Sequence, residues 1–251
     1  MDKQEKPLFL FGINPVLEKL KASPQEVLEI MIAEGHQRAA LHLIDREAKR
    51  RGLNVRYLEP KLLDRLANGQ KHQGVVAKVD SYSYCLFVNL LHDLSSSQGH
   101  DLVLILDGLT DPRNFGALLR SAEGVGIRHV VIPKDRSVGV TPTVVKSSAG
   151  AVHYLKIYRV SNLRRVILAL KEIGYWVVGL DVGANEGVYG RVYPEKLVVV
   201  LGAEGAGIRP LTRKECDFLV SIPMRGKIAS LNVAVAGGIF LYEILRQRSS
   251  V

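Results

Sequence analysis

The alternation of apolar and polar positions predicts two successive series of helices and strands. In residues 8–79, amphipathic stretches with a 3.6-residue repeat alternate with short runs of β-branched and apolar residues. The repeat predicts helices at 11–23, 38–52 and 60–69. The apolar runs predict strands at 27–33, 54–59 and 74–79. Residues 8–79 are therefore expected to form a small mixed α/β domain.

From residue 101 the pattern changes to apolar runs without polar alternation. Such runs are typical of strands buried on both faces, and hence of a parallel sheet covered by helices on both sides. The predicted strands are 102–108, 129–133, 175–181, 197–202 and 218–223. Helices are predicted at 114–124, 141–150, 162–174 and 230–248. Residues 101–251 thus form a second α/β domain, and residues 80–100, with the polar sequence SSSQGH, form a linker that can include a helix at 86–94.

Composition narrows the class of protein. The net charge of +9 is spread over both domains. It suits a polyanionic partner such as RNA, although a basic protein without such a partner is as compatible with charge alone. The two cysteines are far apart and the histidines lack metal-ligand spacing, so we expect no disulfide framework and no metal. The most apolar long stretch, 231–245, contains Asn232 and Glu243 and is too short for a membrane span, so a cytoplasmic protein is expected.

Three loops follow predicted strands of the second domain, where open α/β sheets bind ligands. The first, LDGLTDPRNFGALLR, contains Asn114 and Arg120, which by pattern alone are a helix cap and a solvated helix residue. The second, LGAEGAGIRP, has the spacing G-x-x-G-x-G, which differs from a dinucleotide loop and from a P-loop, and carries Glu204. The third, SIPMRGKIASLN, contains Ser230, which is expected to cap the last helix.

Taken together, NFGALLR, LGAEGAGI and IPMRGKIASLNVAVA resemble the three signature motifs of the SpoU (TrmH) family of RNA ribose 2′-O-methyltransferases. The resemblance implies a trefoil-knotted α/β fold, S-adenosylmethionine as methyl donor and a homodimer. FGINPVLEKL and KHQGVVAKV resemble the borders of the small RNA-binding domain, similar to ribosomal protein L30e, found in one branch of the family. That branch implies a guanosine of 23S rRNA, free or in an assembling large ribosomal subunit, as the substrate.

Matching the motifs residue by residue implies roles for individual side chains. The cofactor-binding residues implied are Gly202, Glu204, Gly205, Ile222, Met224 and Leu231. The catalytic residues implied are Asn114, Arg120, Glu204, Ser230 and Asn232, with Glu204 expected to orient Arg120 or Arg209. Arg120 is the family's candidate base. Because a guanidinium stays protonated, we favour a role in binding phosphate and stabilising the alkoxide as it forms.

Basic residues predict the RNA surface: Arg50, Arg51, Arg113, Lys134 and Lys146. For the first two, ion pairs along a solvated helix are the alternative, because Asp45–Lys49 and Glu47–Arg51 have i,i+4 spacing. Two positions depart from the branch's pattern, Ala234 in place of a second serine and His153 in place of a glutamate.

The same chemistry on tRNA, or at an rRNA site that confers antibiotic resistance, remains an alternative substrate. A non-catalytic RNA-binding or ribosome-assembly protein is the alternative from another class.

Overall fold

The computed structural model describes residues 7–35, 38–80, 82–96 and 101–249. Proximity between Cα atoms divides the chain into two compact units. The first comprises the chain up to Ser83 together with Val140–Tyr154, and the second comprises Tyr84–Gly139 and the chain from Leu155. The sequence assigns residues 140–154 to the second domain, whereas in the structure they belong to the first unit.

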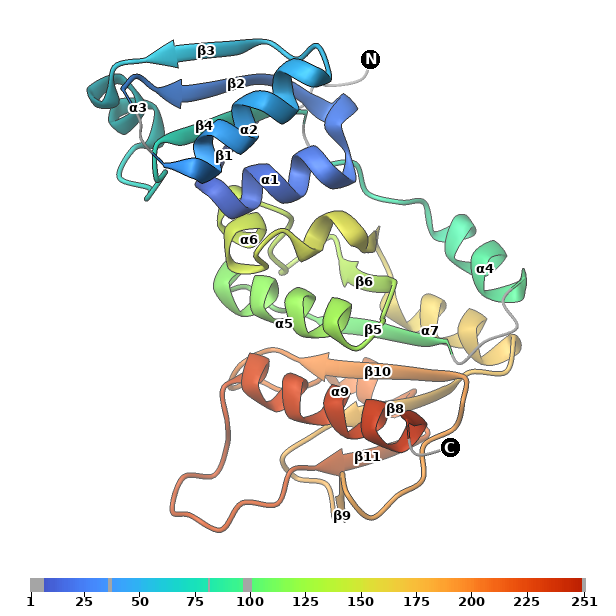
Figure 1. Cartoon of the computed structure of the whole chain (residues 1–251). Helices are drawn as coiled ribbons and strands as arrows, with labels where there is room; N and C mark the ends of the chain where they lie inside the picture. Colours follow the sequence, from blue (N-terminus) through green and yellow to red (C-terminus); the bar gives the residue numbers. More distant parts are fainter. Residues whose placement is uncertain (1–6, 36–37, 81, 97–100, 250–251) are drawn as a thin grey trace. The chain divides into compact units, whose positions relative to one another are not determined.

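The first unit is built on a four-stranded sheet with the order β1-β4-β2-β3. Its strands are β1 (Leu8–Phe11), β2 (Val27–Ala33), β3 (Val55–Leu58) and β4 (Val75–Val79). Strand β2 is parallel to β3, and the other two pairings are antiparallel. The helices are α1 (Ile13–Ala22), α2 (Ala39–Arg50) and α3 (Pro60–Ala67), and the short 3₁₀ helix η1 (Pro24–Glu26) precedes β2 (Figure 1). The six elements expected here are confirmed; β1 was not predicted.

Two further elements complete the first unit, α6 (Pro142–Ser147) and the 3₁₀ helix η2 (Ala151–Tyr154). Helix α6 packs against β1, and η2 packs against α1. At Gly150, where φ is +90°, an added Cβ would lie 2.4 Å from the Cβ of Glu18. The Tyr154 hydroxyl donates to Glu18 Oε2 over 2.6 Å. These contacts join residues far apart in sequence, so the local pattern could not predict that residues 140–154 belong to the first unit.

The second unit contains a seven-stranded sheet in the order β7-β6-β5-β10-β8-β11-β9, in which every pairing is parallel. The strands are β5 (Leu102–Asp107), β6 (His129–Pro133), β7 (Lys156–Val160), β8 (Trp176–Leu180), β9 (Glu186–Gly187), β10 (Leu197–Gly202) and β11 (Phe218–Ser221). The five predicted strands are confirmed. The edge strands β7 and β9 were not predicted.

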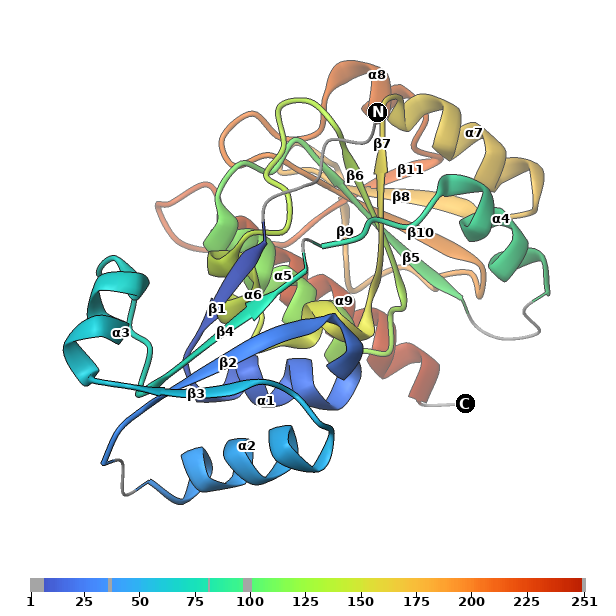
Figure 2. The ribbon, with the colours of Figure 1, turned by 90° about the horizontal axis from the view of Figure 1, so that it is seen from above.

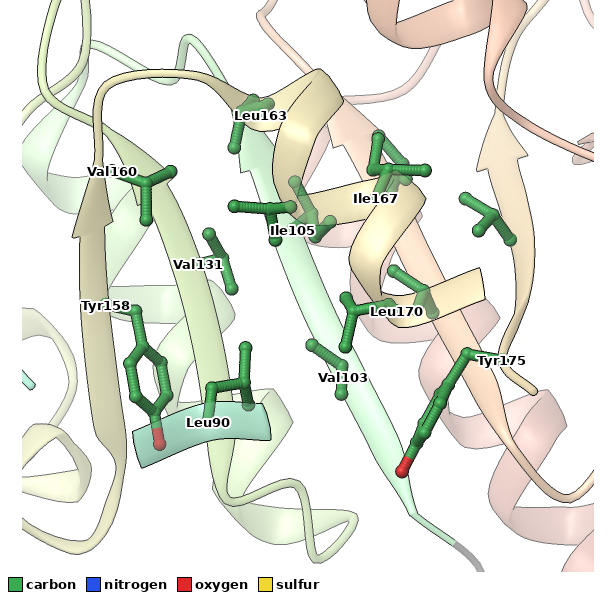
Figure 3. Packing of buried hydrophobic residues seen from close by; sticks show 14 of the residues in the cluster. Leu90, Val103, Ile105, Val131, Tyr158, Val160, Leu163, Ile167, Leu170 and Tyr175 are labelled. Carbon is green, nitrogen blue, oxygen red and sulfur yellow. The ribbon is translucent and has the colours of Figure 1, made fainter. Parts of the chain in front are cut away.

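Helices cover both faces of this sheet, as expected (Figure 2). They are α4 (Phe87–Ser96), α5 (Pro112–Gly124), α7 (Leu163–Glu172), α8 (Pro210–Lys214) and α9 (Val233–Ser249). On one face, α4 and α7 bury a cluster that includes Leu90, Ile105 and Leu170 (Figure 3). On the other, α5 and α9 pack together, and Gly237 of α9 lies so close to Leu118 and Leu201 that an added Cβ would clash with both.

Parallel strands place their carboxyl ends at one edge of the sheet. In register, Asp107 at the end of β5 lies opposite Gly202 at the end of β10. Strand β10 also pairs with β8, and β8 with β11. The loops that follow these four strands are therefore neighbours in space, although the ends of β5 and β11 are 114 residues apart in sequence.

Candidate active site at the carboxyl ends of the strands

A cavity of about 680 Å³ opens at the carboxyl edge of the second sheet. Its walls come from the loops after β8, β10 and β11 and from the start of α9. Every residue implied to bind the cofactor lies in its lining: Gly202, Glu204, Gly205, Ile222, Met224 and Leu231. Asp181 and Arg213 also line it and were not predicted, although Asp181 ends the apolar run YWVVGLD and could have been found by its position. The volume is that of a small-molecule site.

Glycine is required in the loop after β10 because two stretches of backbone touch there. Ala203 and Gly207 exchange two backbone hydrogen bonds, of 3.0 and 2.9 Å. A Cβ on Gly202 would lie 2.0 Å from the carbonyl carbon of Gly207, which no side-chain movement could relieve. Gly205 and Gly207 have φ of +77° and +68°, in the left-handed region that favours glycine. The loop therefore presents backbone groups, rather than side chains, to one wall of the cavity.

Three polar side chains, from the first turn of α5, the loop after β10 and the start of α9, form one hydrogen-bonded network beside this cavity. The Asn114 amide donates to Glu204 Oε2 over 3.0 Å. The Asn232 amide donates to Asn114 Oδ1 over 3.0 Å and to Glu204 Oε1 over 3.3 Å. The structure thus brings together three of the predicted catalytic residues, which lie up to 118 positions apart in the sequence.

Neither Asn114 nor Ser230, the caps that residue pattern alone favours, caps its helix. Helix α5 is capped by Asp111, whose carboxylate accepts from Arg113 N, and Asn114 lies within the first turn. Helix α9 begins after Asn232, whose Oδ1 accepts from Ala234 N over 2.9 Å and from Val235 N over 3.4 Å. Ser230 is an exposed residue of the cavity lining instead. The amide of Asn114 is consequently available to the network, and Asn232 serves both as cap and as network member.

Arg209, in the loop after β10, contacts residues that follow two other strands: the fully buried carboxylate of Asp107 at the end of β5 and the backbone of Arg136 after β6. Its Nε lies 3.4 Å from Asp107 Oδ1, and its backbone N donates to Oδ2 over 3.0 Å. Its guanidinium also donates to the carbonyl oxygen of Arg136 over 3.4 Å. The prediction that Glu204 orients Arg120 or Arg209 is not supported by these contacts, because Glu204 accepts from two asparagines and Arg209 pairs with Asp107.

The remaining predicted residues of the second unit lie on its surface. Arg120 is an exposed residue of α5 and is absent from the cavity lining. Arg113 and Lys134 are exposed, in the first turn of α5 and directly after β6. Such positions suit contact with a large ligand outside the cavity.

In the first unit, the expected ion pairs of α2 are present. Lys49 contacts Asp45 at 2.9 Å, while Arg50 and Arg51 lie 2.9 and 3.6 Å from Glu47. The Lys146 ammonium donates to the carbonyl oxygen of Lys71 over 3.2 Å.

His153 is largely buried, and burial lowers its pKa to about 4, an effect that Lys19 increases and Glu18 opposes. Because His153 lies in η2, the histidine that replaces the glutamate of the related branch packs within the first unit and not at the donor cavity. Ala234 donates its backbone N–H to Asn232 Oδ1 over 2.9 Å.

Within the described part of the chain, no three His, Cys, Asp or Glu side chains are grouped as metal ligands. In the same residues, no helix has the length and apolarity needed to cross a bilayer.

Comparison with known proteins places this site in a family. The model described as the SpoU rRNA Methylase family matches residues 101–242, and the model for RNA 2′-O ribose methyltransferase substrate binding matches residues 9–85. The chain is 40% identical to the 23S rRNA (guanosine-2′-O-)-methyltransferase RlmB of Shewanella oneidensis over 250 residues, 100% of both chains. It is 42% identical to RlmB of Coxiella burnetii over 241 residues, 96% of both chains.

Among solved structures, the SpoU methyltransferase AviRb from Streptomyces viridochromogenes in complex with AdoMet has a TM-score of 0.80 at 25% identity. The match covers 98% of this chain and 92% of AviRb. The family model covers more than half of the chain, and the two relatives match 100% and 96% of it. The chain belongs to the SpoU rRNA methylase family.

Proposed function

We propose that this protein transfers a methyl group from S-adenosylmethionine to the ribose 2′-hydroxyl of a guanosine in 23S rRNA. The observation that carries the proposal is the hydrogen-bonded group of Asn114, Glu204 and Asn232 beside a cavity bounded by the glycine loop. Full-length relatives named for this reaction support the substrate.

The cavity fits the methyl donor on its own chemistry. Its wall at Gly202 is a backbone cradle that a Cβ would fill, so backbone N–H and C=O groups can approach a polar ligand closely. Ile222, Leu231 and Met224 offer an apolar surface suited to the adenine ring. Burial raises the pKa of the Asp181 carboxyl, but hydrogen bonds from Arg213 and from the Gly183 backbone outweigh it and lower the pKa, so Asp181 is an ionised acceptor suited to ribose hydroxyls.

When bound, S-adenosylmethionine supplies an electrophilic methyl group on a positively charged sulfur. The protein's task is to hold the 2′-oxygen in line with that methyl and to exclude water. Asn114 and Asn232, fixed by their mutual hydrogen bond and by Glu204, position the ribose. The hydroxyl proton passes to solvent as the new C–O bond forms and the methyl group leaves its sulfur. Arg120, permanently protonated, binds the RNA phosphate and stabilises the negative charge that develops on the oxygen.

The proposal also includes the trefoil knot, the L30e-like domain and the homodimer that the resemblance to the family implies. The loops after β10 and β11 both line the cavity, which is compatible with a trefoil knot, and the β1–β4 sheet with its helices is compatible with an L30e-like domain. Exposed Val235 and Tyr242 lie seven residues apart on one side of α9, where a second copy of the chain can pack to form a homodimer. Cytoplasmic rRNA, within an assembling large ribosomal subunit, is the proposed setting. Arg113 and Lys134 extend the RNA surface around the site, and Arg50, Arg51 and Lys146 extend it on the first unit.

The test is methyl transfer from isotope-labelled S-adenosylmethionine to unmodified large rRNA and to tRNA, followed by digestion and identification of the labelled nucleoside by mass spectrometry. Label in 2′-O-methylguanosine from 23S rRNA is expected. Label in tRNA alone would contradict the substrate. Absence of label from both RNAs and from unmodified large-subunit particles, with S-adenosylmethionine bound in calorimetry, would contradict catalysis.

A further inference from the structure

A second cavity lies wholly within the first unit, at the end of β2 and beside the loop 68–74 that joins α3 to β4. It has a volume of about 670 Å³, enough for a nucleotide. Ala33 and Leu41, both buried, contribute apolar lining, and seven of the twelve lining residues are polar or charged. The catalytic site of the second unit uses none of its residues.

The loop at this cavity is held in an unusual backbone conformation. Asn68, Gly69, Gln73 and Gly74 all have positive φ, between +43° and +90°. Two of the four carry side chains, which rarely adopt this region without a compensating contact. For Gln73 the compensation is evident: its Oε1 accepts from Ile13 N over 3.1 Å, and its carbonyl oxygen accepts from Arg38 over 3.3 Å.

Further hydrogen bonds fix the centre of the loop. Gly74 N donates to His72 Nδ1 over 3.2 Å, so Nε2 carries the proton that is donated to Asp64 Oδ1 over 2.8 Å. Lys146 donates to the carbonyl oxygen of Lys71. An added Cβ on Gly74 would lie 2.9 Å from Leu41 Cδ1, so this end of the loop sits directly on α2. The loop is thus rigid, and the Lys71 side chain remains exposed at the cavity.

Charged groups of both signs line this cavity: the cations Arg38 and Lys71 and the carboxylates Glu34 and Asp64. A free phosphate would meet two anions there, and an apolar ligand would make no use of the four charged groups, which are all exposed. A nucleotide can bind groups of both charges, because its phosphate can accept hydrogen bonds from the cations and the N–H groups of its base can donate to a carboxylate. Guanine, with adjacent N1–H and N2–H₂ donors, presents the edge that a carboxylate accepts from most completely.

We propose that this cavity binds one unstacked guanine nucleotide of the RNA substrate, distinct from the nucleotide that is methylated. The inference rests on the proposed function for the identity of the RNA. Single-stranded or bulged RNA exposes such bases, and reading one of them in a pocket gives sequence selection that phosphate contacts alone cannot give.

The direct test is titration of the full-length ¹⁵N-labelled protein with guanosine 5′-monophosphate, with S-adenosylhomocysteine in excess to occupy the other cavity. Saturable shifts of the Gly69, Lys71 and Gly74 amides are expected, and smaller shifts with uridine 5′-monophosphate. Asp64→Asn, which keeps an acceptor for His72 but removes the charge, is expected to reduce the preference for guanine. Shifts confined to other parts of the chain, or equal for both nucleotides, would overturn the proposal.

The functional test compares Lys71→Glu with Arg46→Glu, an equal charge change at an exposed residue of α2 outside the cavity lining. Lys71→Glu is expected to raise the KM for a 23S rRNA transcript about tenfold with kcat unchanged. Arg46→Glu is expected to raise it by no more than about twofold. Equal KM values for the two variants would overturn the site.

Failure of the site and failure of the proposed function give different results. Retained nucleotide shifts without methyl transfer by the wild-type protein support the site and refute the function. Normal methyl transfer without nucleotide shifts overturns the site alone.

Discussion

Asn232 has two separable tasks, and a pair of substitutions distinguishes them. Its Oδ1 caps α9, and its amide group donates to Asn114 and Glu204. Asn232→Ser retains a good capping residue and removes the amide, whereas Asn232→Ala removes both. We therefore expect a loss of activity in both variants and a larger loss of stability in Asn232→Ala, which alone also loses the cap.

The expected magnitudes follow from the hydrogen bonds that each substitution removes. Loss of the cap costs about 1 kcal/mol, or about 2–4 °C in the melting temperature of a chain of this length. A hydrogen bond to a charged group contributes about 1.5–3 kcal/mol, which we reduce to about 1–2 kcal/mol because Glu204 is exposed. Misplacement of the network should therefore lower kcat about 5- to 30-fold in both variants.

The assays are methyl transfer under single-turnover conditions, thermal unfolding, and calorimetric titration with S-adenosylmethionine. Donor affinity is expected to change little, because the hydrogen bonds of Asn232 go to the protein itself. Wild-type turnover in Asn232→Ser would refute the catalytic role of the network. An equal loss of stability in both variants would refute the assignment of the cap.

Three further outcomes are expected. Gly202→Ala should abolish binding of S-adenosylmethionine in calorimetry, because its Cβ would meet the Gly207 backbone at 2.0 Å; near-normal affinity would contradict the backbone cradle. Arg209→Ala should lower the free energy of unfolding in urea by about 2 kcal/mol, since it leaves the buried Asp107 carboxylate without its cation; Arg209→Lys should lose less. The pKa of His153 is about 4 in the fold, below its usual value of 6.5, so the unfolded chain alone gains a proton between these values. Stability should therefore decline as pH falls from about 6.5 to 4, and His153→Gln should show a shallower decline over that interval.

Local pattern predicted the interior of the fold well because buried parallel strands are uniformly apolar, as in LVLILD and LVVVLG. It missed β7, KIYRV, whose two exposed charged residues interrupt the apolar run at the sheet edge. It also assigned residues 140–154 to the second domain, because a contact such as that between Tyr154 and Glu18 leaves no periodic signal.

The motifs predicted the lining of the donor cavity but not the geometry around it. Ser230 and Asn232 are equally plausible caps by residue type, and only the start of α9 in space decides between them. The pairing of Arg209 with Asp107 joins positions 102 residues apart and depends on the register of β5 with β10. The cavity beside loop 68–74 was not found because Gln73 and Asn68 do not indicate left-handed backbone as glycine does.

The position of β10 also sets when activity can arise during synthesis. This strand separates β5 from β8, so the sheet is in two disconnected halves until residues 197–202 have been made and inserted between them. Asn232 emerges later still, and chains are made at about 5–20 residues per second. A nascent chain therefore carries its whole N-terminal unit, and any RNA affinity of that unit, for several seconds before it has a site that can react. An interrupted translation product would therefore lack the reactive site, whatever its N-terminal unit binds, which makes complete synthesis a condition for turnover.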